Sequence, residues 1–223
     1  MPWLGFFDKI HNSDTFVILD TVKCSKNSFF NRNKFSTDKS LKKVFWLSVP
    51  LNKESYSNEI KDATSSEKIF LNKHVKYFKN RHGKTLESNF LEEIISIYEA
   101  EINSQLPVLN VSEFNISLIN TVLKCLDLNV NILKSSDMII DKDLKKQDLI
   151  LEILRNTGCT TYISGTGARE YQRESDFLKN NISLKYNRPN LEIVPTVDSN
   201  HLSAIDLILQ EGSWNIRKKM TLA

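Results

Sequence analysis

The stretch Thr161-Tyr162-Ile163-Ser164-Gly165-Thr166-Gly167-Ala168-Arg169-Glu170 indicates the fold class of this chain. Its opening residues predict a strand over 160–164, and the helical spacing that follows predicts a helix over 170–178. The same alternation continues on both sides, with strands expected over 131–133 and 182–186 and helices over 144–156 and 202–210. Strands separated by helices of this length predict an α/β architecture with parallel strands.

The residues before this region add two strands and a run of helices. Apolar and β-branched residues predict strands over 15–22 and 44–49, and a short helix is expected over 4–10. Segment 23–34 is polar apart from Phe29 and Phe30, and its last four residues, 31–34, are expected to form a loop when read alone. Three more helices are expected in a helical insertion at about 65–127. We therefore expect a single α/β domain over residues 1–223, with a mixed or mostly parallel central sheet flanked by helices.

Composition excludes several classes of protein. The 223 residues include 30 basic and 27 acidic side chains, so the net charge is only +3 and no nucleic-acid partner is expected. The three cysteines show no CxxC spacing and the four histidines no metal-ligand spacing, so neither a disulfide framework nor a metal site is expected. No apolar run approaches the roughly 20 residues of a membrane span, and no signal peptide is recognisable. A cytoplasmic protein is the expectation.

Glycine is scarce, with six in the whole chain, yet three glycines fall between positions 158 and 167. Gly158 and Gly212 each follow the end of a predicted helix and are expected to close it at positive φ. Gly165 and Gly167 admit two interpretations, a tight turn or a ligand-binding loop. The amides of a helix N-terminus and the Arg169 guanidinium would favour an anion there, and we prefer the binding loop. Neither the dinucleotide fingerprint nor the phosphate-loop motif is complete, so no cofactor is expected.

Three further places carry residues suited to chemistry. His74 lies on the apolar face of a predicted helix, where it is either a hydrogen-bonded core residue or, beside a cleft, a general base. Asp20 lies near the carboxyl end of a predicted strand, where α/β sheets place ligand contacts, although a capping or turn role fits equally. Asn31-Arg32-Asn33-Lys34 offers amides and a guanidinium suited to sugar hydroxyls and anions. Cys24 and Cys159 are interpreted as inert.

The order of several short segments resembles the WbqC-like family over nearly the whole chain. They are Pro2-Trp3-Leu4-Gly5-Phe6-Phe7, Phe16-Val17-Ile18-Leu19-Asp20, Lys26, Asn31-Arg32-Asn33, Trp46-Leu47-Ser48-Val49-Pro50, Lys73-His74, Thr157-Gly158 to Tyr171, and Leu202-Ser203-Ala204-Ile205-Asp206-Leu207. The resemblance implies a bacterial protein of O-antigen or other surface polysaccharide synthesis, and an amino-acid transfer such as glycine onto a sugar. The motif positions implied by it are Asp20, Lys26, Asn31, Arg32, Asn33, His74, Ser164, Gly165, Gly167, Arg169, Tyr171 and Asp206.

The combined hypothesis is an acyl or aminoacyl transferase acting on a small-molecule or nucleotide-linked sugar, or on a lipid-linked one. His74 would be the general base and Asp20 its orienting or substrate-binding carboxylate. The substrate would contact Lys26, Asn31, Arg32, Asn33, Ser164, Gly165, Gly167, Arg169 and Tyr171. The donor, the acceptor and the oligomeric state are not specified by the sequence.

Two alternatives stay open. A non-catalytic sugar- or nucleotide-binding accessory protein of the same pathway would have His74 fully buried and bonded to backbone. An inactive, N-terminally truncated member is the other alternative, since the family opens with a strand and a Gln-Pro-x-Tyr-like motif before Pro-Trp-x-Gly, whereas Met1 directly precedes Pro2. Three further departures are Thr21 in the second of two acidic positions, Cys24 in an aromatic position and Phe70 in that of a tryptophan.

Overall fold

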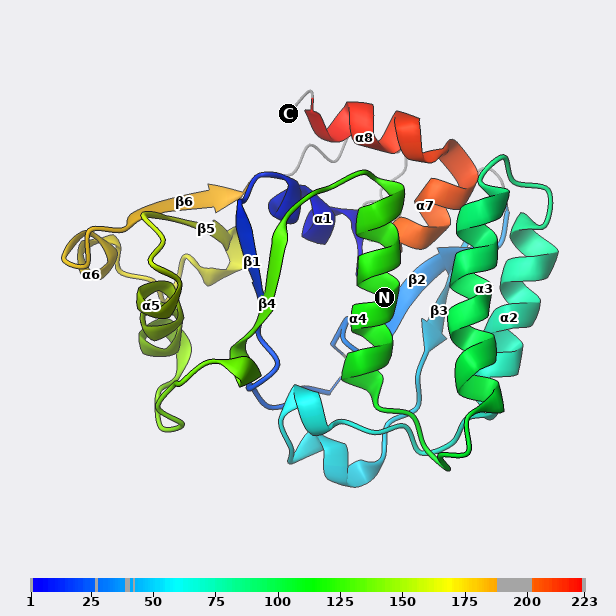
Figure 1. Cartoon of the computed structure of the whole chain (residues 1–223), viewed down its shortest axis with the longest axis horizontal. Coiled ribbons are helices and arrows are strands. Elements are labelled where there is room, and N and C mark those ends of the chain that lie inside the picture. Colours follow the sequence, from blue (N-terminus) through cyan, green and yellow to red (C-terminus); the bar gives the residue numbers. More distant parts are fainter. Residues whose placement is uncertain (1, 27, 39–40, 42, 188–201, 222–223) are drawn as a thin grey trace. The chain divides into compact units, whose positions relative to one another are not determined.

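A computed structural model describes residues 2–26, 28–38, 41, 43–187 and 202–221 (Figure 1). The chain divides into two compact units. Unit 1 contains residues 1–8, 21–129 and 190–223, and unit 2 contains residues 9–20 and 130–189. The first helix, α1 (Leu4–His11), begins in unit 1 and ends in unit 2. The expectation of a single domain stays a prediction, because units that share the chain in this way can belong to one domain.

Unit 1 is built largely from helices. The predicted helical insertion contains α2 (Ile69–His82), α3 (Ser88–Asn103) and α4 (Val111–Cys125), and Figure 1 shows these three helices side by side. The C-terminal helices α7 (Ala204–Glu211) and α8 (Ser213–Thr221) follow, of which α8 is not expected from the sequence. Two short 3₁₀ helices, Lys53–Tyr56 and Ile60–Asp62, complete the described helices of this unit.

Aromatic side chains form the core between these helices. Tyr98 is fully buried, and its ring meets those of Phe78 and Phe114 edge to face, with centroids 5.7 and 5.0 Å apart. Edge-to-face pairs at this distance are the favoured geometry for aromatic rings. The start of α4 is fixed by Asn110, whose side chain accepts a hydrogen bond from the Glu113 amide. The insertion therefore has its own well-packed interior.

The antiparallel ribbon of β2 (Arg32–Ser36) and β3 (Val44–Ser48) corrects one expectation, because β2 begins within the segment predicted to be a loop. Its residues are mostly polar, yet alternate ones face inward: Asn33 and Phe35 are both fully buried. Phe35 packs edge to face against Tyr77 and Phe78 of α2. Pairing with β3 and burial against α2 override the polar composition of this segment.

Unit 2 contains the parallel strands. β1 (Thr15–Ile18) pairs with β4 (Asn131–Lys134), and β5 (Thr161–Gly165) pairs with β6 (Ser183–Asn187). The helices of this unit are α5 (Lys146–Thr157) and α6 (Glu174–Leu178), with a 3₁₀ turn at Ser135–Asp137 and another at Thr166–Ala168. Its small core consists of Leu151, Leu154, Phe177 and Ile182. The predicted α/β class is confirmed, and the described strands pair in three two-stranded ladders.

Helix α6 is shorter than the predicted 170–178 because a side chain from another helix fixes its start. The Gln147 side chain accepts a hydrogen bond from the Arg173 amide at 2.6 Å and donates one to Asp176 at 2.9 Å. These two bonds place the first turn of α6 after Arg173. The residues after β5 consequently form the short turn Thr166–Ala168 instead of leading into a helix.

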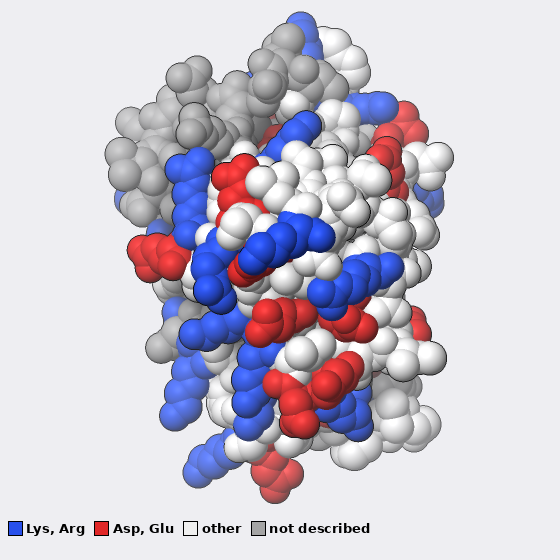
Figure 2. Space-filling view, turned by 90° about the vertical axis from the view of Figure 1, so that its left-hand side faces the viewer, with Lys and Arg blue, Asp and Glu red and all other residues white. Residues whose placement is uncertain are grey.

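The surface of unit 2 carries charges of both signs. Figure 2 shows Lys and Arg side chains interspersed with Asp and Glu over the face that carries α5 and α6. Asp176 forms ion pairs with Arg173 and Lys179, at 3.3 and 3.4 Å. Across the described ranges of both units, none of the helices combines the length and the apolar character that a bilayer span requires.

Candidate functional site

His74 lies in the aromatic core of unit 1. It is 3% exposed, its Nδ1 is 3.3 Å from the Tyr98 hydroxyl, and its ring packs edge to face on Phe70. Burial lowers its pKa to about 4, against which a hydrogen bond with the Ser48 backbone acts. The imidazole is therefore neutral near pH 7. This is the arrangement that the binding-protein alternative expects of His74, and its role as a base stays a prediction.

Asp20 lies two residues beyond β1, in unit 2, as expected for the carboxyl end of a strand. Its carboxylate accepts hydrogen bonds from the hydroxyls of Ser135 and Ser136, at 2.8 and 2.6 Å, and from the Ser136 amide at 2.9 Å. Its own amide donates to the Ser135 hydroxyl. With 1% of its surface exposed, Asp20 anchors the turn after β4, which is the turn role that the sequence left open.

The predicted contacts near β2 fall into two groups. The amides are occupied locally: Asn31 donates to the Val49 carbonyl at 2.9 Å, and Asn33 accepts from the next backbone amide at 2.7 Å. The two cations lie near aromatic rings instead. Lys26 is exposed with its Nζ 5.9 Å from the Tyr56 ring, and the Arg32 guanidinium lies 4.3 Å from the ring centroid of Trp46. Of the predicted substrate contacts near β2, Lys26 is exposed and Arg32 is partly exposed.

The predicted glycine loop differs from the expectation in one respect. Gly165 has an ordinary φ of −73°, and a Cβ added at Gly165 or Gly167 would meet nothing within 4 Å. Neither position requires glycine for the fold, whereas Gly158 and Gly212, at φ of 64° and 86°, are confirmed at positive φ. The helix expected to begin at Glu170 begins at Glu174 instead, and the loop leads first into the 3₁₀ turn Thr166–Ala168. An anion site at backbone amides beside Gly165 and Gly167 stays a prediction.

The side chains of this loop are arranged around the end of β5. Ser164 is 1% exposed and its hydroxyl donates to the Gly165 carbonyl at 3.3 Å. The Arg169 guanidinium lies 4.6 Å from the Tyr186 ring centroid, and Tyr171 is half exposed. Arg169 and Tyr171 are accessible to a ligand, and their binding roles stay predictions.

A buried cluster is centred on Asp206 in α7, a residue that the family resemblance implied as a motif position without indicating its partners. Oδ1 of Asp206 accepts hydrogen bonds from the Tyr77 hydroxyl and from Nε2 of His82, each at 2.7 Å, and Oδ2 accepts one from the Ser36 amide at 2.8 Å. The side chains of His82 and Asp206 are 1% and 0% exposed. Asp206 thus joins β2, α2 and α7 through one carboxylate.

The carboxylate determines which nitrogen of His82 carries the proton. A carboxylate accepts hydrogen bonds, so Nε2 of His82 is the nitrogen that donates to Oδ1 of Asp206. Burial and the neighbouring Asp206 raise the pKa of Tyr77 well above its ordinary value, which keeps its hydroxyl a donor. The result is a histidine oriented by a carboxylate, an arrangement that suits general-base catalysis.

Local sequence explains why His82 ends its helix. A Cβ at the next residue, Gly83, would lie 2.5 Å from the Lys79 carbonyl oxygen, so glycine fits best there. The chain then turns, with the Thr85 amide bonded to the His82 carbonyl and the Thr85 hydroxyl to the Leu209 carbonyl at 2.7 Å. The turn therefore ties the end of α2 to α7.

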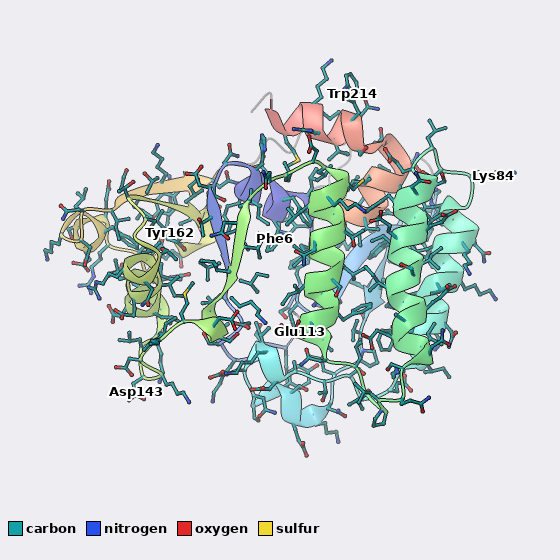
Figure 3. The ribbon with its side chains drawn as sticks, in the orientation of Figure 1. Phe6, Lys84, Glu113, Asp143, Tyr162 and Trp214 are labelled. Atoms are coloured by element: carbon teal, nitrogen blue, oxygen red, sulfur yellow. The ribbon has the colours of Figure 1, made fainter. Side chains whose placement is uncertain are left out.

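His82 also lines a cavity of about 210 Å³ between the end of α2, the turn after it and the end of α7. Cationic Arg81 and Lys84 contribute to its wall, with Glu87 and Gln210; Lys84 is labelled in Figure 3. The Arg81 guanidinium donates to Gln210 at 2.7 Å and to the Asp38 carbonyl at 2.8 Å. The cavity combines a candidate base with positive charge, within one unit.

A larger cleft of about 570 Å³ lies within unit 2, between β1, β5 and α5. Tyr162, labelled in Figure 3, lines it together with Thr15 and Lys9. Burial lowers the pKa of Lys9, whose Nζ lies 5.4 Å from the Phe16 ring centroid. Sequence analysis gave Lys9 no role, because nothing in its neighbours distinguishes it from a surface lysine.

Among the described residues, no group of three or more His, Cys, Asp or Glu side chains is placed to hold a metal ion. Burial raises the pKa of the Cys24 thiol, and burial together with Glu87 raises that of Cys125 to about 12. Both thiols are protonated near pH 7 and are poor nucleophiles.

Comparison with known proteins places the chain in a family. A sequence model of the WbqC-like protein family matches residues 1–218. The chain belongs to this family. The chain is also similar to the uncharacterized protein Rv1507c of Mycobacterium tuberculosis, with 25% identity over 178 residues, which cover 79% of this chain and 73% of that protein. No solved structure gives a significant match.

Proposed function

We propose that this WbqC-like protein transfers an acyl or aminoacyl group, such as glycyl, to a nucleotide-linked or lipid-linked sugar during bacterial surface polysaccharide assembly in the cytoplasm. Family membership over residues 1–218 supports the pathway. The observation that carries the reaction type is the His82–Asp206 pair, 2.7 Å apart, beside a cavity that also contains Arg81 and Lys84.

These residues match the requirements of acyl transfer. Nδ1 of His82 takes the proton of an acceptor amine or hydroxyl as that group attacks the carbonyl of an activated donor, such as a thioester. A new C–N or C–O bond forms, the C–S bond breaks, and His82 returns the proton to the departing thiolate. Asp206 stabilises the transient imidazolium, while Arg81 and Lys84 supply positive charge for the developing oxyanion.

The size of the cavity fits the transferred group. At about 210 Å³ it is smaller than the roughly 300–1,000 Å³ of pockets that enclose a drug-sized ligand. An acetyl or glycyl group fits within it, whereas a whole nucleotide sugar does not. The remainder of the sugar substrate must therefore lie on a neighbouring surface.

The non-catalytic alternative has its own support. His74 is buried and bonded to the Ser48 backbone, as that alternative expects. An accessory protein would bind a sugar or nucleotide and gain thermal stability from it, yet it would release no transfer product. Within the transferase proposal, His74 with Asp20 is a second candidate for the base and its orienting carboxylate, in competition with His82 and Asp206. Substrate binding by the Ser164 to Arg169 loop also remains part of the proposal.

Deletion of the gene from its host, followed by mass spectrometry of the released surface polysaccharide, tests the proposal. We expect the repeat unit to lose the mass of one acyl or aminoacyl group and to regain it when the wild-type gene is restored. An unchanged repeat unit would rule out this function. Complete loss of the polysaccharide, with no unsubstituted form, would favour the accessory role instead.

A further inference from the structure

The outward face of the β2–β3 ribbon presents aromatic rings and cations together. Lys34 is directly opposite Trp46 in the antiparallel register, and Arg32 lies on the same face two residues before Lys34. The residues that follow each of these cations, Asn33 and Phe35, point inward and are fully buried. The ribbon is therefore buried on one face and has a second face of distinct composition.

The rings on this second face are accessible. Trp46 is 42% exposed and Phe29 is 41% exposed, and their ring centroids lie 5.8 Å apart. The Arg32 guanidinium lies 4.3 Å and Lys34 Nζ 5.8 Å from the Trp46 centroid. Single exposed apolar side chains are ordinary, but an exposed aromatic pair beside two cations is a patch with a chemical preference.

We propose that this face binds the base and phosphates of a nucleotide-linked sugar, an inference that rests on the proposed transferase function and specifies its substrate class. A flat base stacks on Trp46 and Phe29, and the diphosphate accepts hydrogen bonds from Arg32 and Lys34. Neutral sugars offer a stacking face without the charge, and nucleotides offer both. The positive charge of this surface thus favours binding of a nucleotide-linked sugar over binding of a free, uncharged sugar.

The position of this face along β2 agrees with the proposed transfer site. Ser36, whose amide binds Asp206, is four residues from Arg32 on the same strand, which corresponds to roughly 13 Å at the rise of an extended chain. The ribose and diphosphate that separate the base from the sugar together span a distance of this order. With the base held at Trp46, the sugar would extend along the ribbon toward the cavity that His82 lines.

A matched aromatic–cation pair elsewhere in the chain gives the control. Trp214 is 68% exposed with Lys218 Nζ 5.1 Å from its ring centroid, so Trp214→Ala and Lys218→Ala each remove an exposed indole or a neighbouring cation, as Trp46→Ala and Arg32→Ala do. The full chain is titrated calorimetrically with uridine, guanosine and deoxythymidine diphosphates, and separately with inorganic pyrophosphate and N-acetylglucosamine. Circular dichroism confirms folding of each variant, with Trp46→Phe as a milder second substitution.

We expect at least one nucleoside diphosphate to bind, and Trp46→Ala and Arg32→Ala each to weaken it by about tenfold or more, while the Trp214 and Lys218 variants bind within about twofold of wild type. Pyrophosphate and the free sugar should bind more weakly than the nucleotide. Absence of nucleotide binding, or binding that survives Trp46→Ala unchanged, would overturn the inference. A failure of the transfer function alone is recognised separately, because the deletion strain would then retain a normal repeat unit.

Discussion

Nε2 of His82 lies 2.7 Å from Oδ1 of Asp206, between side chains that are 1% and 0% exposed. The two residues are 124 positions apart in sequence, at the end of α2 and in the first turn of α7. Such a buried charged or polar pair is costly to desolvate and persists only when its hydrogen bonds are satisfied. Here Tyr77 and Ser36 complete them, so the pair is a structural junction and, in the proposed transfer, the base and the group that orients it.

Replacement of Asp206 by Asn should destabilise unit 1. Oδ1 faces two donors and Oδ2 faces a third, so either orientation of the amide places its NH₂ group against an N–H or O–H. We expect a loss of about 3 kcal/mol in the free energy of unfolding, measured in urea. Asp143→Asn, at an exposed position, is the control and should change stability by less than about 0.5 kcal/mol. Equal effects of the two variants would show that the junction is unimportant.

His74 should make the protein sensitive to acid. Its pKa in the folded protein is about 4, below its ordinary value of 6.5, so on acidification the unfolded chain takes up a proton first. Stability is therefore greatest above pH 6.5 and falls between pH 6.5 and 4, by roughly 3 kcal/mol, since a tenfold change in proton affinity is worth about 1.4 kcal/mol.

Unfolding of the wild type and of His74→Gln, compared at pH 7 and 4.5, measures this contribution. The Gln variant should lose less stability than the wild type over the same interval. Identical pH profiles would contradict the burial assigned to His74.

The glycines separate into required and replaceable positions. Gly83→Ala brings a Cβ to 2.5 Å from the Lys79 carbonyl oxygen, and we expect it to cost about 1–3 kcal/mol and to loosen the turn beside His82. Gly165→Ala enters open space and should leave the melting temperature unchanged. If Gly165→Ala were instead the more damaging, the backbone described for that loop would be wrong.

Lys9→Met should raise stability at neutral pH. Burial lowers the pKa of Lys9 from its ordinary 10.5, which means that the charged amine is disfavoured in the folded state. The charged amine therefore destabilises the folded protein, and this penalty disappears as pH rises toward 10.5. Removal of the charge should raise the melting temperature most at pH 7, where the amine is charged in the unfolded chain. Lys79→Met, exposed and paired with Glu99, is the control and should give no gain.

Hydrophobic periodicity predicted the helices and strands that are specified by their own local sequence. The helices α2 to α4 lie within the predicted insertion, and α5, β4, β5 and β6 lie close to their predicted ranges, because apolar residues recur at the spacing of a buried face. β1 begins at Thr15 as predicted but ends at Ile18 rather than Val22. β2 was missed because its strand conformation depends on β3, and α6 was predicted too long because Gln147 from α5 fixes its start. Both errors arise from tertiary contacts that override local sequence.

The candidate site was less accessible to prediction. No local sequence pattern singled out His82, whereas the apolar helix face singled out His74. Only the fold brings His82 to Asp206. A signal did exist at the other partner: Asp206 lies within the otherwise apolar run that follows Ser203, and a charge in such a run must find buried donors. That reasoning identifies Asp206 as a buried carboxylate, although it leaves the identity of its partners to the structure.

The central claim is that His82, oriented by Asp206, acts as the base in acyl transfer. The most direct test restores the deletion strain with His82→Gln or with His74→Gln, both verified as folded, and measures the mass of the polysaccharide repeat unit. The account predicts that His74→Gln restores the acyl or aminoacyl group and that His82→Gln does not. Restoration of the group by His82→Gln would contradict it, and failure of His74→Gln beside that restoration would assign the base to His74 instead.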